Sequence, residues 1–218
     1  MARRPPRHDD PDMTDGTSRR RAESNRVEAF SDGVFSIAIT LLVLELAIPA
    51  VQGKFAEELL DEWVSYLAYL AAFGSIGVLW MGHHTVFTFI ARVDAGLLWR
   101  NLLLLLTVSA LPFPTAVIAS AYRVGNLEDQ AAAVLAYAVV GMASGVAWLV
   151  LFTYIRPRHH LIEPGTDPRF FGPLGPIVTF VGYGIAALVG GFISPGLALA
   201  IFVLFPAFYL VLVRRWSS

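Results

Sequence analysis

The 218-residue chain is too apolar for a soluble domain, because 56% of its residues are hydrophobic and only 15% are charged, against roughly 45–50% and about a quarter in soluble proteins. The formal net charge of -1 conceals charges that gather in short blocks between long apolar runs. Without cysteine, the chain forms neither disulfides nor thiolate metal sites. We therefore expect a polytopic membrane protein.

The chain starts with a polar segment. Residues 1–24 are charged, carry prolines and hold almost no large apolar side chain. Such a composition buries too little surface to offset the entropy of ordering the chain. We expect a disordered tail, and its acidic residues and lack of a small-residue cleavage site argue against a signal peptide.

Six apolar stretches follow, each long enough to supply the about 20 residues with which a helix crosses a bilayer. They lie near residues 27–48, 57–91, 96–121, 130–155, 173–193 and 196–213. The amphipathic start of the second stretch, EELLDEW, is expected to project from the membrane before the apolar part begins at Trp63. We predict an all-α polytopic membrane protein with six transmembrane helices per chain, in one domain over residues 25–218.

Basic residues indicate the orientation, because cytoplasmic loops are enriched in Lys and Arg. They precede span one, link spans two and three, link spans four and five, and end the chain: Arg19, Arg20, Arg21, Arg26, Arg92, Arg100, Arg156, Arg158, Arg169, Arg214 and Arg215. With an even number of spans these segments share one side, and the opposite loops are mainly acidic. Both termini, and with them the tail, are therefore expected in the cytoplasm.

The first span opens with ionisable residues, which are costly in a bilayer unless they face the bundle or water. Glu28 and Asp32 suit the solvated N-terminus of a helix, which is one interpretation. The other is a buried polar network. At about 1.5 Å per residue, Asp32 lies at the depth of His83 and His84 in span two, and Asn101 at the start of span three reaches the same layer.

Two histidines stand side by side in span two. Trp80 and His84 are four residues apart and share a helix face. His83 and His84 diverge by about 100° around the helix, and no HExxH motif accompanies them. We therefore expect no metal site here.

An apolar stripe runs further along span one. Ile37, Leu41 and Leu44 have the spacing i, i+4, i+7 and share a face, with Thr40 at its edge. Asp32 points about 140° away from Ile37 on an ideal helix. Periodicity alone favours ordinary helix packing as the role of this stripe.

Span five contains the string VGYG at residues 181–184, which resembles the carbonyl filter of ordinary potassium channels. Phe180 separates it from Thr179, and the preceding PGTDPRFFGPLGP is too rich in proline and glycine for a pore helix. The favoured interpretation is a set of glycines that allow close helix packing.

The string RVEAFSDGVFSIAITLLVLEL at residues 26–46 closely resembles the first-span signature, Arg-x-x-x-Phe-Ser-Asp, of one family. This is the bacterial branch of the lysosomal potassium channel called transmembrane protein 175. The strings WMGHHTVF at residues 80–87 and the later Asn101 with PFP at residues 112–114 look like the second and third spans of that family. The resemblance covers most of residues 26–122 and agrees with six spans.

The resemblance implies a homotetrameric, potassium-selective channel in the cell membrane, without a re-entrant filter loop. In that family the first helices of four subunits surround the axis. The residues carried over as a hydrophobic pore constriction are Ile37, Leu41 and Leu44, with Thr40 at a layer where some relatives use threonine. Those carried over as a network that braces the pore helix are Arg26, Phe30, Ser31 and Asp32, with Trp80, His84 and Asn101 as partners.

Other functions remain as alternatives. A proton-coupled secondary transporter would use Asp32 with His83 and His84 as a relay, but no inverted repeat or pair of broken helices indicates one. The sequence shows neither a nucleophile with a matched base nor a metal motif, so it does not indicate an enzyme. The expected partners are the other copies of the chain in a homotetramer, membrane lipids and transported K⁺, with no cofactor and no nucleic acid.

Overall fold

The computed structural model describes residues 11–48 and 51–217, and its elements are almost all helical. The main helices are α1 (Pro11–Leu41), α2 (Phe55–Asp61), α3 (Trp63–Phe87), α4 (Ala95–Ala110), α5 (Pro112–Val124), α6 (Leu127–Ile155), α7 (Leu174–Phe192) and α8 (Pro195–Ser217). Three short 3₁₀ turns, η1 (Leu42–Glu45), η2 (His159–Leu161) and η3 (Pro168–Phe171), complete the list.

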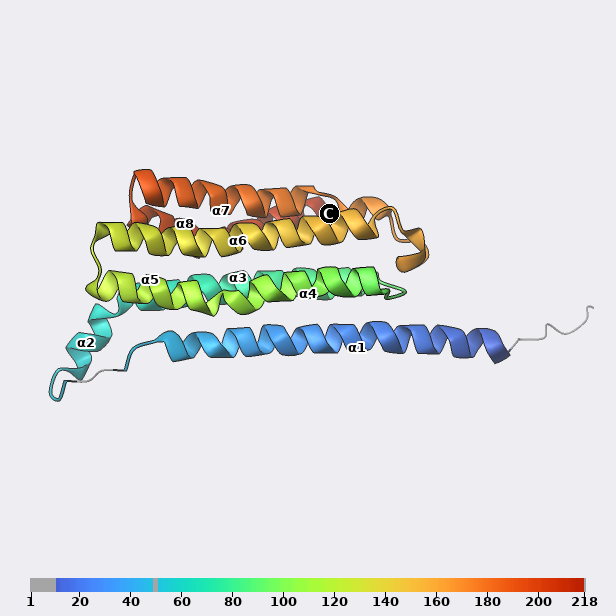
Figure 1. Cartoon of the computed structure of the whole chain (residues 1–218), viewed down its shortest axis with the longest axis horizontal. Coiled ribbons are helices and arrows are strands. Elements are labelled where there is room, and N and C mark those ends of the chain that lie inside the picture. The colour runs from blue at the N-terminus through green and yellow to red at the C-terminus, as the bar shows by residue number, and fades with distance from the viewer. Residues whose placement is uncertain (1–10, 49–50, 218) are drawn as a thin grey trace, which may run out of the picture.

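Six apolar helical segments confirm the predicted fold class. Five are long and apolar enough to cross a bilayer: Ala22–Glu45, Trp63–Phe87, Ala95–Val124, Leu127–Ile155 and Pro168–Phe192. The sixth is the shorter apolar stretch Pro195–Val211 of α8. Figure 1 shows the long helices side by side in one elongated bundle.

The tail differs in part from the expectation. Helix α1 begins at Pro11, so residues 11–24 continue the first span as helix where we expected disorder. The sequence RRRAES at residues 19–24 consists of residues with fair to good helix propensity, and an existing helix extends over such residues at little cost. Residues 1–10 lie outside the described part of the chain.

Two predicted spans are divided. The second separates at Glu62 into the short helix α2 and the long helix α3, which begins at Trp63 as expected. The third separates at Leu111 into α4 and α5. Pro112 and Pro114 follow directly, and because proline lacks an amide hydrogen, it ends one helix and suits the first turn of the next.

Helices α6 and α7 pack at close range because glycines line their contact. A side chain at Gly141 would collide with the ring of Tyr183, and a Cβ at Gly145 would lie 2.9 Å from the backbone nitrogen of Phe180. The VGYG string lies inside α7, where Gly182 receives the ring of Phe205 from α8. The string is therefore part of a packed helix, in agreement with the favoured interpretation.

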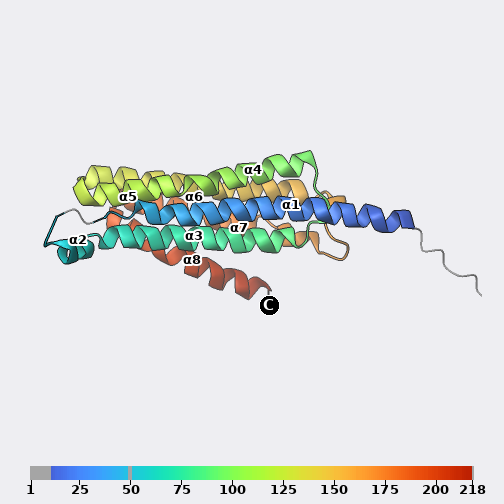
Figure 2. The ribbon, with the colours of Figure 1, turned by 90° about the horizontal axis from the view of Figure 1, so that it is seen from below.

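Helix α1 lies at one edge of the bundle. Figure 1 shows α1 along one side of the bundle. In Figure 2 it lies in front, with α3 on one side of it and α4 and α5 on the other, and it packs mainly against these three helices. Its buried face carries Phe35, Ala38 and Leu42. The opposite face has no neighbour among the described residues, so α1 is held from one side only.

Replacing Gly141 with Ala is expected to lower the stability of the fold by about 1–3 kcal/mol, because the added methyl group meets the buried ring of Tyr183. Gly191→Ala on α7 is the matched control, since nothing lies within 4 Å of its Cβ position. Thermal unfolding in detergent measures both. Equal unfolding temperatures for the two variants would contradict this account of the α6–α7 contact.

Candidate functional site

A chain of hydrogen bonds connects three helices at one end of the bundle. On α3, Nε2 of His83 donates to Oδ1 of Asn101 on α4, at 2.9 Å. Nδ2 of Asn101 donates to the hydroxyl of Ser31 on α1, also at 2.9 Å. The Ser31 hydroxyl in turn donates to the carbonyl of Val27, at 2.9 Å. Each side chain in this chain of hydrogen bonds therefore donates one bond to the next group.

The three side chains are almost completely buried, with exposed fractions of 0% for His83, 1% for Asn101 and 0% for Ser31. Aromatic rings enclose the imidazole: Phe87 stacks on it with centroids 4.2 Å apart, and Phe35 of α1 lies at 5.4 Å. The Nδ1 atom of His83 has no partner among the described residues. With its proton on Nε2, the neutral imidazole suits this apolar surrounding.

A second set of polar contacts joins α1 to α3 nearer the surface. Nε1 of Trp80 donates to Oδ1 of Asp32 at 2.9 Å, and Nδ1 of His84 donates to Oε1 of Glu28 at 2.9 Å. Glu28 and Asp32 are one turn apart on α1, and their partners His84 and Trp80 are one turn apart on the antiparallel helix α3. The rings of Trp80 and His84 also stack, with centroids 5.9 Å apart.

These contacts fix how α1 is rotated about its own axis. Apolar packing tolerates sliding and rotation, whereas a hydrogen bond requires one donor and one acceptor in line. Measured interhelical hydrogen bonds in membranes contribute about 0.6–2 kcal/mol each. With partners on α3 and α4, the polar face of α1 at residues 27–32 is held against the bundle.

The structure does not place two of the predicted bracing residues in this network. Phe30 is 57% exposed and lies one position before Ser31, so its side chain projects about 100° around the helix from the bonded serine. Arg26 is exposed, and within the described residues no ion pair or hydrogen bond joins it to the network. The other five, Ser31, Asp32, Trp80, His84 and Asn101, come together.

The predicted constriction residues form an uncovered stripe on α1. Ile37 is 61% exposed, Leu41 42% and Leu44, in the turn η1, 74%. Thr40 is exposed beside them, and its hydroxyl donates to the carbonyl of Ile37 at 2.9 Å. Phe30 lies seven residues before Ile37 and extends the same stripe by two turns.

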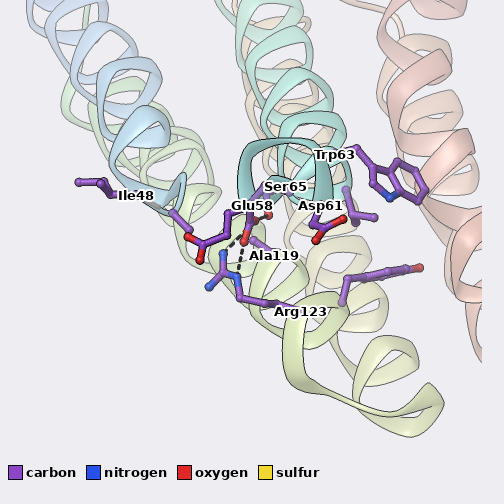
Figure 3. A pocket seen from close by; sticks show the side chains of 11 residues that line it. Ile48, Glu58, Asp61, Trp63, Ser65, Ala119 and Arg123 are labelled. Atoms are coloured by element: carbon purple, nitrogen blue, oxygen red, sulfur yellow. Dashed lines mark hydrogen bonds and ion pairs between the residues drawn. The ribbon is translucent and has the colours of Figure 1, made fainter. Parts of the chain in front are cut away.

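The other end of α1 approaches a surface pocket of about 700 Å³. Figure 3 shows this pocket, with Arg123 reaching from the end of α5 toward the start of α3. Arg123 donates to both carboxylate oxygens of Glu62, at 2.6 and 3.0 Å. This hydrogen-bonded guanidinium holds the pKa of Glu62 below its usual range. The ion pair joins α5 to the start of α3.

Within residues 11–48 and 51–217, no group of three or more His, Cys, Asp and Glu side chains is placed to hold a metal ion. His83 and His84 point to different neighbours, one to Asn101 and one to Glu28. The polar side chains of the network around His83 thus connect helices. The stripe on α1 is the part of that helix that no other described helix covers.

Comparison with known proteins places these features in a family. Residues 26–112 match the family model described as the endosomal/lysosomal potassium channel TMEM175. A potassium channel of Streptomyces collinus is 44% identical over 147 residues, which cover 66% of this chain and 70% of that protein. The chain belongs to this family. A potassium channel of Chamaesiphon minutus is 41% identical over 153 residues, covering 67% of this chain and 73% of its relative.

A solved structure agrees with the fold as well. The crystal structure of a lysosomal potassium-selective channel TMEM175 homologue from Chamaesiphon minutus superposes with a TM-score of 0.71 at 34% identity, covering 87% of this chain and 97% of the other. As a member of the family, the chain is an ion-channel protein. The matched region 26–112 contains every predicted site residue.

Two contributors to the network were not predicted as such. Glu28 suited either a solvated helix N-terminus or a polar network and was not included among the bracing residues, yet it pairs with His84. The i, i+4 spacing of Glu28 and Asp32 matches that of Trp80 and His84 on an antiparallel helix, and this was the available signal. Ser24 donates to the carbonyl of Ile90 at 3.2 Å, a contact to backbone that no side-chain pattern reveals.

Replacing Asn101 with Ala is expected to destabilise the fold by about 1–3 kcal/mol, because Nε2 of His83 and the hydroxyl of Ser31 lose their buried partner. Thr85→Ala is the control: its exposed hydroxyl bonds only to its own helix, at the carbonyl of Met81. Thermal unfolding in detergent compares the two. A loss no larger for Asn101→Ala than for Thr85→Ala would show that the network does not brace α1.

Proposed function

We propose that the chain is a passive, potassium-selective channel whose pore is lined by α1 of each of four subunits. Ile37, Leu41 and Leu44 form its hydrophobic constriction, and Thr40 contributes hydroxyl oxygens to it. The observation that carries this proposal is the uncovered stripe on α1, whose direction is fixed by hydrogen bonds on the opposite side of the helix. Family membership supports the choice of ion.

An oligomer is needed because a single α1 cannot enclose a pore. Six transmembrane helices pack against one another in each chain, and the stripe lies outside that packing. A ring of copies that met along α1 would cover the stripe and surround an axis.

The proposed constriction works by controlling water. A ring of isoleucine or leucine narrower than a hydrated ion dewets and blocks conduction, and a slightly wider ring lets a partly dehydrated ion pass. Leu41 lies four residues beyond Ile37, or about 6 Å along the helix, so the two rings form consecutive barriers. Potassium gives up its water more readily than sodium and therefore passes at lower cost.

Thr40 is suited to assist an ion at this level. Its hydroxyl hydrogen is already donated to the carbonyl of Ile37, at 2.9 Å. The oxygen lone pairs therefore remain as acceptors on an exposed side chain. Four such oxygens around an axis would replace part of the water that K⁺ loses.

The same proposal includes the membrane location, the orientation and the partners of the protein. The chain lies in the cell membrane with both termini cytoplasmic, because the basic residues gather on the side of the α1 N-terminus. Its partners are three further copies of itself and the surrounding lipids, and K⁺ is the transported ion. Conduction requires neither a cofactor nor a catalytic group.

A proton-coupled transporter fits the arrangement less well. A proton relay needs titratable groups at hydrogen-bonding intervals across the membrane. In α1 and η1, no ionisable residue lies between Asp32 and Glu45. The ionisable residues of α1 therefore stop before Ile37, and this favours a passive pore.

Replacing Ile37 with Asn is expected to hydrate the constriction, raising the basal cation flux and reducing the preference for K⁺ over Na⁺. Purified protein in liposomes, loaded with one cation and diluted into the other, reports both quantities. Leu188→Asn on α7 adds the same amide at an apolar site that is also 61% exposed, and should leave the flux unchanged. Flux in Ile37→Asn equal to that of the unmodified chain would contradict the pore assignment.

A further inference from the structure

A small polar pocket lies between α4 and α6, apart from the network and from the stripe on α1. It has a volume of about 230 Å³, and its lining residues are Arg100, Val150, Thr153, Tyr154 and Arg158. The first comes from α4, the next three from α6, and the last from the segment directly after α6. No role in conduction has been assigned to any of them.

Two guanidinium groups share one aromatic ring in this pocket. The central carbon of Arg100 lies 3.8 Å from the centroid of the Tyr154 ring, and that of Arg158 lies 3.7 Å from it. Each also donates one hydrogen bond to backbone, Arg100 to the carbonyl of Gly96 and Arg158 to that of Tyr154, both at 2.8 Å. Because a guanidinium has five N–H donors, most of theirs remain available.

The ring itself is fixed in place. The hydroxyl of Tyr154 donates to Oδ2 of Asp94 at 2.9 Å, and Oδ1 of Asp94 accepts the amide of Leu97 at 2.7 Å. Gly96 lets the ring approach α4, because a Cβ there would collide with the tyrosine hydroxyl. The two arginines are therefore positioned before any ligand arrives, which lowers the entropic cost of binding one.

The pocket carries excess positive charge. Asp94 is the acidic residue beside it, and both of its oxygens are occupied by Leu97 and Tyr154. Over the described part of the chain, neither Arg100 nor Arg158 forms an ion pair. Two guanidiniums without a carboxylate partner have the charge and the N–H donors that bind a phosphate group.

Its position suits a ligand that belongs to the membrane. The pocket lies where α4 begins and α6 ends, on the side of the bundle that also holds the N-terminal part of α1 (Figure 1). One turn deeper, the same faces of α4 and α6 present the apolar side chains of Leu103 and Val146, which are 41% and 44% exposed. A charged site thus continues directly into an apolar surface.

We propose that Arg100 and Arg158, held on Tyr154, bind the phosphate of an anionic phospholipid whose acyl chains lie along Leu103 and Val146. Basic pockets between transmembrane helices on the cytoplasmic side recognise such headgroups. Thr153 lines the same pocket, but its hydroxyl hydrogen is donated to the carbonyl of Leu149 at 2.8 Å, so the two arginines are the donors to the headgroup. This site does not depend on which helix conducts the ion.

Native mass spectrometry of the full chain in detergent tests this proposal, with phosphatidylglycerol and phosphatidylcholine as probes. The unmodified protein should retain phosphatidylglycerol in preference. The double variant Arg100→Gln with Arg158→Gln should bind it at least about tenfold more weakly, since two charge-assisted contacts are lost. Arg156→Gln removes an exposed arginine of the same segment that does not line the pocket, and should bind as the unmodified chain does.

Each of four results would overturn the proposal. Equal retention of the two lipids would exclude recognition of the anionic headgroup, and an equal loss in Arg156→Gln would assign the binding to general surface charge. Displacement of the lipid by millimolar inorganic phosphate would assign the pocket to a soluble anion. If the double glutamine variant does not fold, Arg100→Lys with Arg158→Lys replaces it, and unchanged affinity there would contradict a site built on paired guanidiniums.

Discussion

The hydrogen-bonded chain from His83 through Asn101 to Ser31 is the constraint on which the rest of the proposed mechanism depends. It is buried between three helices, where an unpaired polar group is costly, so each member holds the others in place. Helix α1 touches the bundle on one side only. Without these hydrogen bonds, only apolar packing would determine how α1 is rotated about its own axis.

Fixing that rotation divides α1 into two faces with different roles. The bonded face ends at Asp32, and the packed face continues through Phe35, Ala38 and Leu42. The uncovered stripe with Ile37 and Leu41 is what remains. Closure of a constriction by dewetting is sensitive to small changes in diameter, so a pore helix of this kind needs bracing from behind.

Sequence predicts the parts of this structure that depend on composition and spacing. Hydropathy identified the six spans, and depth counting brought Asp32, the two histidines and Asn101 to one level. It did not decide between His83 and His84 as the partner of Asn101, because adjacent residues have the same depth and differ only in direction. The exposure of Phe30 and the division at Leu111 likewise depend on packing and proline geometry. Whether the stripe on α1 faces an axis depends on neighbouring copies, which no single chain contains.

The central claim is that the uncovered stripe on α1 faces the conducting pathway. The chain has no cysteine, so a single introduced cysteine is the only thiol that can react. Ag⁺ binds such a soft ligand tightly. The decisive measurement is the effect of Ag⁺ on K⁺ current through Leu41→Cys, with Leu188→Cys on the exposed surface of α7 as the control. The account predicts rapid block of Leu41→Cys alone; block of Leu188→Cys alone, or of neither, would contradict it.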